Sequence, residues 1–205
     1  MKLRLEVLSP VTISCSYTSI NEIYTVDYIP ATVLRGVLAS VYIKEKGISD
    51  PMEDNLFKEI FLSGKCIFGN LYYNEASLLP LSALSCKYNS GFIPDAHGVK
   101  DMVIPRLKND MKCLESCSCC NAPMDNFRGF YKRERGCFTK VEVPKRLIAR
   151  TAINPMRETA AHGELFSMEA INEGSFFTGR LYVDNGLKDK VSEFLNSREV
   201  RIGTA

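Results

Sequence analysis

One stretch near the start of the chain has apolar residues at clear helical spacing. Six apolar side chains between residues 31 and 45 recur three or four positions apart, which places them on one face of a helix. Pro30 comes just before the first turn, where its missing N–H costs no hydrogen bond. We therefore predict a helix over about 31–45. Its apolar residues are Val33, Leu34, Val37, Leu38, Val41 and Tyr42.

Extended segments flank this helix, and a second helical stretch lies near the end of the chain. Residues 2–14 begin with alternating apolar and charged side chains, which is typical of a strand. Leu187, Val191 and Phe194 share one helical face, and residues 198–205 have the pattern of a last strand. We also predict a short helix turning into a strand over 57–74, extended segments over about 78–89 and 139–154, and two strands over 163–184.

The order strand, helix, strands, helix, strand predicts an α+β fold. It is the order of a ferredoxin-like (RRM-like) βαββαβ domain, in which the helices cover one face of an antiparallel sheet and the other face can meet a ligand. Residues 90–137 interrupt this order with glycine, proline, cysteine and charged residues. We predict a single domain over residues 1–205, with an insertion over about 86–138.

The chain shows neither a signal peptide nor a membrane span. Its first residues alternate, and no apolar run approaches the ~18 residues that a spanning helix needs. These observations predict a cytoplasmic protein with no membrane partner. The net charge is only +2, so a nucleic-acid partner has to be argued from where the cations lie.

The cysteines indicate a metal site, because a reducing cytosol disfavours a disulfide framework. Four of the eight cysteines crowd into eight positions, namely Cys113, Cys117, Cys119 and Cys120. Cys117 and Cys120 have the Cys-x2-Cys spacing with which two thiolates hold one zinc ion. The other ligands would come from the insertion or its borders, where the candidates are Cys86, His97, Cys113 and Cys137. Such a zinc would be structural, because nothing here matches an open catalytic site.

Cations and aromatic residues alternate after the cysteines. Eight cations lie within 23 residues, and they are Arg128, Lys132, Arg133, Arg135, Lys140, Lys145, Arg146 and Arg150. The aromatic residues among them are Phe127, Phe130, Tyr131 and Phe138. This mixture is typical of a groove for single-stranded nucleic acid. The alternative is a charge-balanced surface, because Asp125, Glu134 and Glu142 lie in the same region.

Catalysis has little support in the sequence. There are two histidines and no serine or cysteine in a recognisable nucleophile setting. His162 is the one candidate for assisting metal-independent RNA cleavage. Asp27 and Asp101 are possible carboxylates, but each stands alone.

Several segments together resemble one family. "YIPATVLRGVLAS" and "RTAINPMRETAAHGELFSMEAINEGSFFTGRL" look like conserved elements of the CRISPR-associated RAMP superfamily, and "VRIGTA" looks like the start of its C-terminal glycine-rich loop. Between them, "LPLSALSCKY", "HGVKD", "CSCCNAP" and "GFYKR" are similar to a subunit of type III effector complexes, in the III-D-like group that binds the 5′ end of the guide RNA. The match covers nearly the whole chain.

The resemblance implies a non-catalytic scaffold that binds crRNA inside a type III CRISPR ribonucleoprotein for antiviral defence, beside other effector subunits and without direct DNA contact. The segment Ile153 to Leu165 would form a hairpin that wedges against the guide. The implied RNA contacts are Arg35, Arg150, Asn154 and Arg157, and Lys145 and Arg146 from the basic run join them. The implied zinc ligands are Cys86, His97, Cys117 and Cys120, with Cys113 as the first substitute.

Some positions differ from the family pattern and leave other functions open. Ala31 stands where the family usually has glycine, and Gly203 would begin the glycine-rich loop, so we expect the chain to end inside that loop. One alternative is a RAMP ribonuclease, either a target-cleaving backbone subunit that uses Asp27 or a guide-processing enzyme that uses His162. Another is a zinc-stabilised module that binds protein.

Overall fold

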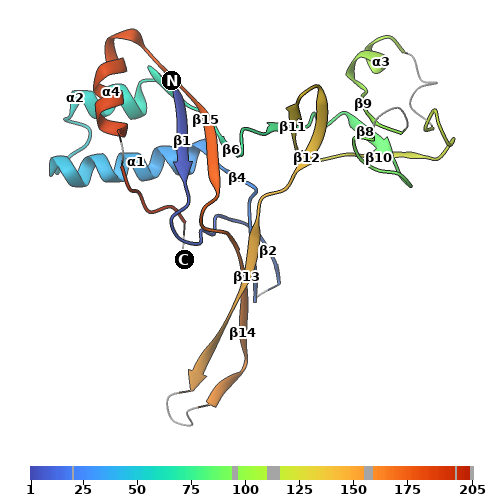
Figure 1. Ribbon diagram of the computed structural model, residues 1–205. Coiled ribbons are helices and arrows are strands. Elements are labelled where there is room, and N and C mark those ends of the chain that lie inside the picture. The colour runs from blue at the N-terminus through green and yellow to red at the C-terminus, as the bar shows by residue number, and fades with distance from the viewer. Residues whose placement is uncertain (20, 94–96, 110–115, 155–158, 197, 204–205) are drawn as a thin grey trace. The chain divides into compact units, whose positions relative to one another are not determined.

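The computed structural model describes residues 1–19, 21–93, 97–109, 116–154, 159–196 and 198–203. Two compact units divide the chain (Figure 1). The first unit combines Met1–Asn74 with Val143–Ala205, and the second is the continuous stretch Glu75–Glu142. No helix in the described part of the chain is long and apolar enough to cross a bilayer.

The first unit contains an antiparallel sheet in the order β1-β15-β6-β4, with β5 pairing to β15 as well. Apolar residues alternate along β15, so one set faces the helices and is buried, as at Phe177 and Leu181. The strands are β1 (Lys2–Glu6), β4 (Tyr28–Ile29), β5 (Cys66–Phe68), β6 (Leu71–Tyr73) and β15 (Phe176–Val183).

Helices pack on this sheet and close the main core. The predicted first helix is confirmed as α1 (Ala31–Lys46), which buries Leu34, Leu38 and Tyr42 and ends at Gly47 in the left-handed conformation. The predicted last helix is confirmed as α4 (Lys188–Leu195), which follows the short helix η3 (Asn185–Leu187). Between α1 and β5 lie α2 (Asn55–Phe57) and the π-helix η1 (Lys58–Leu62).

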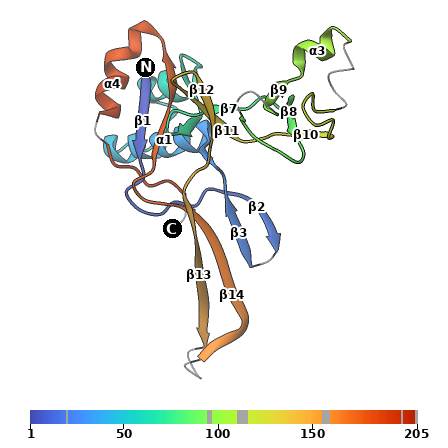
Figure 2. The same cartoon turned by 45° about the vertical axis from the view of Figure 1, so that its right-hand side comes forward.

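A second sheet of the first unit carries a long hairpin (Figure 2). Its strand order is β13-β14-β3-β2, and β14 runs parallel to β3 but antiparallel to β13. The strands are β2 (Ser14–Ser19), β3 (Glu22–Thr25), β13 (Lys145–Asn154) and β14 (Thr159–Ile171). The segment Ile153 to Leu165 therefore includes the end of β13 and the start of β14.

Among its described residues, the second unit has two small antiparallel sheets and one short helix, α3 (Val103–Leu107). One sheet has the order β10-β8-β9, and the other β12-β11-β7. The strands are β7 (Ser77–Leu78), β8 (Ala83–Cys86), β9 (Val99–Asp101), β10 (Met124–Asn126), β11 (Phe130–Glu134) and β12 (Cys137–Val141). Its stretch 75–142 extends beyond the predicted insertion at both ends.

The antiparallel sheets with helices confirm the α+β class. Two of the predicted strands differ from what the structure shows. The first strand ends at Glu6 and not near residue 14. The prediction of a last strand over 198–205 is wrong for residues 198–203, which form no strand. Arg198 holds this segment to the helices, because its Nε donates to the Phe194 carbonyl at 2.6 Å and its guanidinium pairs with Glu45.

Candidate functional site

Four potential metal ligands meet in the second unit. One donor atom from each of Cys86, His97, Cys117 and Cys120 lies within 4.8 Å of all the others. Cys86 ends β8, His97 comes shortly before β9, and the two other cysteines lie in a turn before β10. The pairing of Met124 with Cys86 brings that turn against the end of β8. The cluster could hold a metal ion.

The distances between the donors fit tetrahedral coordination. Thiolates bound at about 2.3 Å to one tetrahedral zinc stand roughly 3.8 Å apart. Cys86 Sγ lies 3.6 Å from Cys120 Sγ, and His97 Nδ1 lies 3.2 Å from Cys117 Sγ and 3.5 Å from Cys120 Sγ. Three thiols and one imidazole are also a donor set that zinc uses. Cys137 is exposed and stands outside the cluster, and Cys113 lies outside the described residues.

The turn favours the thiolate form of Cys117. Asn121 adopts a left-handed conformation and donates its N–H to the Cys117 carbonyl at 2.9 Å, which closes the turn. Backbone N–H groups of Cys119 and then Cys120 point at the sulfur and lower the pKa of Cys117 to about 6. Because thiolates are the form that binds metal, the turn prepares this ligand before any ion arrives.

The β13–β14 hairpin brings an exposed arginine and an exposed aromatic ring together. In the antiparallel register Arg150 lies directly opposite Phe166, so both side chains project from the same face. Both residues are exposed. Among the described residues no carboxylate forms an ion pair with Arg150. This cation is therefore available to an anionic ligand.

Lys145, at the start of the same hairpin, is committed to contacts inside the first unit. Its Nζ lies 2.6 Å from Asp27 Oδ1 and 2.9 Å from Glu169 Oε2, and it donates to the Thr25 carbonyl at 3.1 Å. Burial lowers the pKa of Lys145, but the two carboxylates outweigh this effect and raise it overall. The contacts join β13 and β14 to the end of β3 and the turn between β3 and β4.

The remaining predicted RNA contacts differ in their surroundings. Arg146 pairs with Glu173, and Arg35 is exposed on α1 with no described ion pair. Asn154 ends β13 opposite Thr159, and its side chain lies outside the described residues, as does the whole of Arg157. Gly203 has a positive φ and approaches the Thr12 backbone so closely that a Cβ would collide with it.

One of the free backbone N–H groups at the start of α1 already has a partner within the protein. Asn70 accepts the N–H of Ala31 through its side-chain oxygen at 2.8 Å, which satisfies one of the free donors of the first turn. A groove of about 590 Å³ lies between this helix and the segment Glu199–Arg201 and is lined by Thr32, Gly36 and Ser40 among others. These small side chains leave the helix backbone accessible.

The possible catalytic carboxylates have structural partners. Asp27 is paired with Lys145. Asp101 accepts from Ser82 Oγ at 2.6 Å and from the Val103 N–H at 3.1 Å, and these bonds lower the pKa of Asp101. The side chain of His162 lies outside what the structure describes. Both carboxylates are thus held by partners within the fold.

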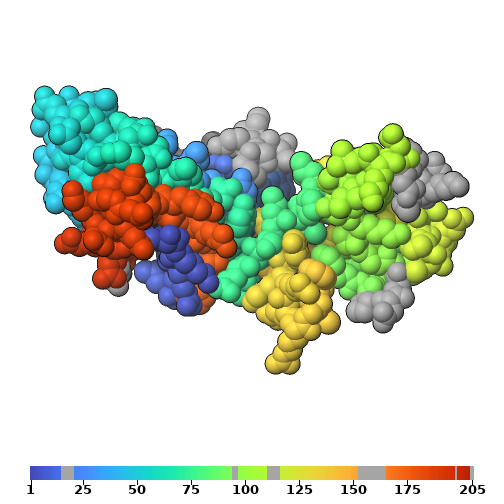
Figure 3. Space-filling view, turned by 90° about the horizontal axis from the view of Figure 1, so that it is seen from above, coloured from blue at the N-terminus to red at the C-terminus, as the bar shows by residue number. Residues whose placement is uncertain are grey.

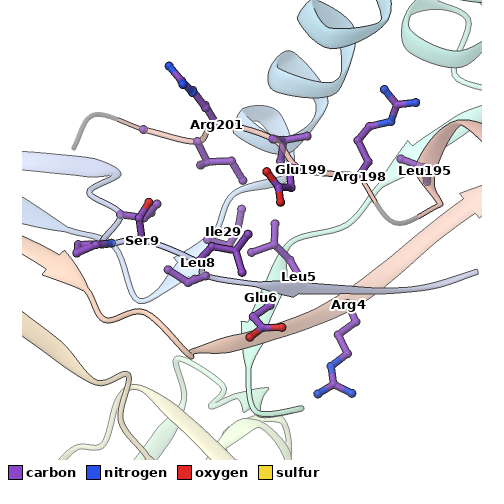
Figure 4. Close-up of a pocket in the computed structure, with 16 residues that line it drawn as sticks. Arg4, Leu5, Glu6, Leu8, Ser9, Ile29, Leu195, Arg198, Glu199 and Arg201 are labelled. Atoms are coloured by element: carbon purple, nitrogen blue, oxygen red, sulfur yellow. The ribbon is translucent and has the colours of Figure 1, made fainter.

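A cavity lies beside β1 in the first unit (Figure 4). Its volume is about 1050 Å³. It is lined by β1 and the loop after it, by Ile29, and by the segment from Leu195 to Gly203.

Several contributing residues escaped sequence reasoning. Glu169 and Thr25 hold Lys145, Phe166 accompanies Arg150, and Phe92 joins the aromatic residues of the second unit. Only the folded structure reveals these partners, because each is distant along the chain.

Comparison with known proteins identifies the family. Residues 4–200 match the RAMP superfamily, so the chain belongs to it. Similar folds occur in a chain of the type III-B Cmr-beta cryo-EM structure in its apo state, with TM-score 0.53, 10% identity, and coverage of 99% of this chain and 91% of that chain. A chain of type III-B Cmr-beta bound to cognate target RNA gives TM-score 0.51, 11% identity, and coverage of 98% and 91%. No curated protein matches the sequence.

Proposed function

We propose that the chain is a non-catalytic, crRNA-binding scaffold subunit of a type III CRISPR ribonucleoprotein. Membership in the RAMP superfamily and the fold shared with chains of type III-B Cmr-beta support this function. The observation that carries it is the β13–β14 hairpin, which presents Arg150 beside Phe166 on an exposed face. The subunit would act in the cytoplasm, in antiviral defence, together with other effector subunits and without contacting DNA itself.

The pair formed by Arg150 and Phe166 suits a single RNA strand. An arginine with no competing carboxylate can bind a phosphate, and an exposed aromatic ring can stack with a base. Arg35 offers a second such cation on α1. Lys145 and Arg146 remain candidates, but RNA would have to compete with their carboxylate partners. We therefore place Arg150 first among the contacts, with Asn154 and Arg157 near the hairpin end, and assign the 5′ handle as the guide segment.

A structural zinc ion completes the proposal. Cys86, His97, Cys117 and Cys120 would supply all four ligands of a tetrahedral site. A full protein ligand set leaves no position for a reacting water, so the ion would stabilise the fold of the second unit and take no part in catalysis. The unit buries only small apolar clusters around Ala83 and Cys86, for which a metal would compensate.

We also assign the first unit to the ferredoxin-like class. Along the chain β1, α1, β6, β15 and α4 supply five of the six elements of a βαββαβ domain. Residues 198–203 follow α4 and line the cavity beside β1, which is where the sixth element is expected. The second unit, Glu75–Glu142, would then be an insertion into this RAMP domain.

The ribonuclease alternatives have weaker support. A metal-dependent cleavage by Asp27 needs a carboxylate that is free to bind a cation, and this one is paired with Lys145 at 2.6 Å. A module that binds only protein would not need Arg150 and Phe166 side by side on an exposed face, whereas RNA binding uses both. Both alternatives are outcomes that the following experiment can reveal.

The test is to express the chain beside a CRISPR array and its partner subunits, purify it, and sequence the RNA that accompanies it. The expected result is enrichment of repeat-derived 5′ tags. Arg150→Gln should reduce this recovery and flatten the salt dependence of RNA binding by roughly 0.7 in the log–log slope, because one phosphate contact is lost. Arg106→Gln, at an exposed arginine of α3, is the matched control and should change neither quantity.

Two results would overturn the proposal. If no RNA were enriched although the protein was folded and partner subunits co-purified, a protein-binding module would be the better explanation. If Asp27→Ala or His162→Ala abolished RNA cleavage but preserved binding, the chain would be a ribonuclease.

A further inference from the structure

The second unit has an aromatic and cationic surface that the proposed function does not use. It lies on one face of the β11–β12 hairpin and consists of Tyr131, Arg133, Phe138 and Lys140. We propose that this hairpin face is a second binding surface for single-stranded RNA. The choice of RNA as its ligand rests on the proposed function. Phe138 would stack with a base, and Arg133 would bind the adjoining phosphate.

The strand register places the four side chains together. Tyr131 is opposite Lys140 and Arg133 is opposite Phe138. Residues two apart on a strand share a face, so both pairs project from the same side of the sheet. Lys132 and Thr139 form the intervening pair and project from the opposite side. The hairpin is drawn in gold and reaches the molecular surface in the space-filling view (Figure 3).

The aromatic rings on this side support one another. Phe138 stacks on Phe92 with ring centroids 5.7 Å apart and planes at 27°, and its centroid lies 5.8 Å from that of Tyr131. Phe92 in turn meets the buried Phe127 edge to face at 5.5 Å. Phe138 nevertheless stays 42% exposed. A ring that its neighbours hold in place while part of it stays exposed loses little conformational entropy when a ligand stacks on it.

The cation beside this ring is available. The guanidinium of Arg133 lies 5.5 Å from the Phe138 centroid, and among the described residues it has no carboxylate partner. Lys140 Nζ is 6.0 Å from the Phe127 centroid and 3.0 Å from Glu142 Oε1, in an exposed pair that a phosphate can displace at little cost. On the opposite side Lys132 pairs with Glu134 at 2.8 Å. The free positive charge therefore lies on the aromatic side.

The charge of this region favours an anionic ligand with flat rings. Between Phe127 and Val141 there is one carboxylate, Glu134, against five cations: Arg128, Lys132, Arg133, Arg135 and Lys140. An aromatic ring extended by a guanidinium plane can stack with any base, while the cations follow the phosphates. An acidic peptide would satisfy the charge but would not use the stacked rings.

The absence of tryptophan from the sequence gives a direct test. Phe138→Trp and Phe166→Trp each introduce a single tryptophan, one on the β11–β12 face and one on the β13–β14 hairpin. Both variants of the full chain are titrated with a uridine-rich single-stranded RNA while tryptophan fluorescence is excited at 295 nm. We expect quenching in both. Leu62→Trp, at an exposed position of η1, should show none and controls for unspecific quenching.

The two tryptophans separate this proposal from the proposed function. If only the tryptophan at position 166 is quenched, the hairpin binds RNA and the β11–β12 face does not, so this inference falls alone. Quenching at position 138 alone would support this inference and remove the role of the hairpin. Quenching at neither position would overturn both.

Removing the charge at each of two adjacent residues tests whether RNA binding depends on this face of the β11–β12 hairpin. In the Phe138→Trp chain, Arg133→Gln should lower the log–log salt slope of RNA binding by about 0.7, whereas Lys132→Gln removes the same charge from the other side and should leave it unchanged. Replacing the ring by Phe138→Leu should weaken RNA binding about fivefold or more. Equal effects of the two charge variants, or tighter binding of poly-glutamate than of RNA, would contradict the proposal.

Discussion

Lys145 Nζ and Asp27 Oδ1 lie 2.6 Å apart, so the first residue of β13 is tied to the turn between β3 and β4. Glu169 on β14 completes the arrangement, since its Oε2 accepts from Lys145 at 2.9 Å and from the Thr25 N–H at 3.2 Å. The base of the long hairpin is thereby fixed to the first unit by charge as well as by strand pairing. The same contacts occupy the carboxylate that a cleaving enzyme would need.

Removing the lysine should therefore destabilise the fold. Lys145→Met leaves the partly buried Glu169 and the half-exposed Asp27 without their cation, and we expect a loss of about 1–2 kcal/mol in the free energy of unfolding. Lys140→Met is the matched control, because the exposed pair of Lys140 with Glu142 should contribute less than about 0.5 kcal/mol. Urea unfolding of both variants measures the difference. Equal stabilities would show that Lys145 has no structural role.

The contribution of Lys145 to the free energy of unfolding should change with pH in one direction. Because the folded protein raises the pKa of Lys145 above its unfolded value of about 10.4, folding favours the charged form. The stabilisation is fully present below the unfolded pKa and is lost as pH rises through the folded pKa. The difference in unfolding free energy between the wild type and Lys145→Met should thus be constant from about pH 7 to 9 and shrink above about pH 10.5. A difference that grew with pH would contradict the assignment.

Metal removal should affect the second unit first. We expect about one zinc ion per purified chain, measured by elemental analysis, and a chelator should speed amide hydrogen exchange within Glu75–Glu142. Cys120→Ser should lose the ion, whereas Cys137→Ser should retain it because Cys137 stands outside the cluster. A metal-free chain with the same exchange protection would remove the site.

Two glycines should respond to alanine in opposite directions. A Cβ at Gly179 in β15 would lie 2.5 Å from Leu71 Cδ2 and would also collide with the Asn70 carbonyl, so Gly179→Ala should cost about 1–3 kcal/mol. A Cβ at Gly36 in α1 meets nothing within 4 Å, so Gly36→Ala should stabilise the helix by about 1 kcal/mol. Thermal unfolding of the two variants checks both signs. Similar shifts would mean that the strands around Gly179 separate easily.

Local patterns predicted the helices well and the last strand poorly. The apolar spacing of Leu34, Leu38 and Tyr42 is a property of one continuous segment, and α1 follows it closely. Val200 and Ile202 alternate in the same simple manner, and both pack against the core without strand pairing. Alternation predicts which side chains are buried, but it does not predict which strand pairs with the segment. The contacts of Arg198 with α4 and α1 hold this segment in place without strand pairing.

The candidate sites too were predictable from the sequence only in part. The metal cluster depends on residue types whose spacing is informative, and Cys117 and Cys120 indeed meet Cys86 and His97. The basic run gave eight cations without distinguishing them. Only the folded arrangement separates Arg150 and Arg133, which have no described carboxylate partner, from Lys145 and Arg146, which do. Ion pairing between distant segments cannot be deduced from charge density.

The short strand β1 has a strand partner only on its β15 side within the described chain. An unpaired strand edge offers N–H and C=O groups to any other extended chain, and proteins protect such edges with charged side chains. The charged residues that alternate along β1 are Lys2, Arg4 and Glu6, and all three are exposed. The alternation that marks this segment as a strand therefore also discourages sheet-to-sheet association between copies of the protein in a crowded cell.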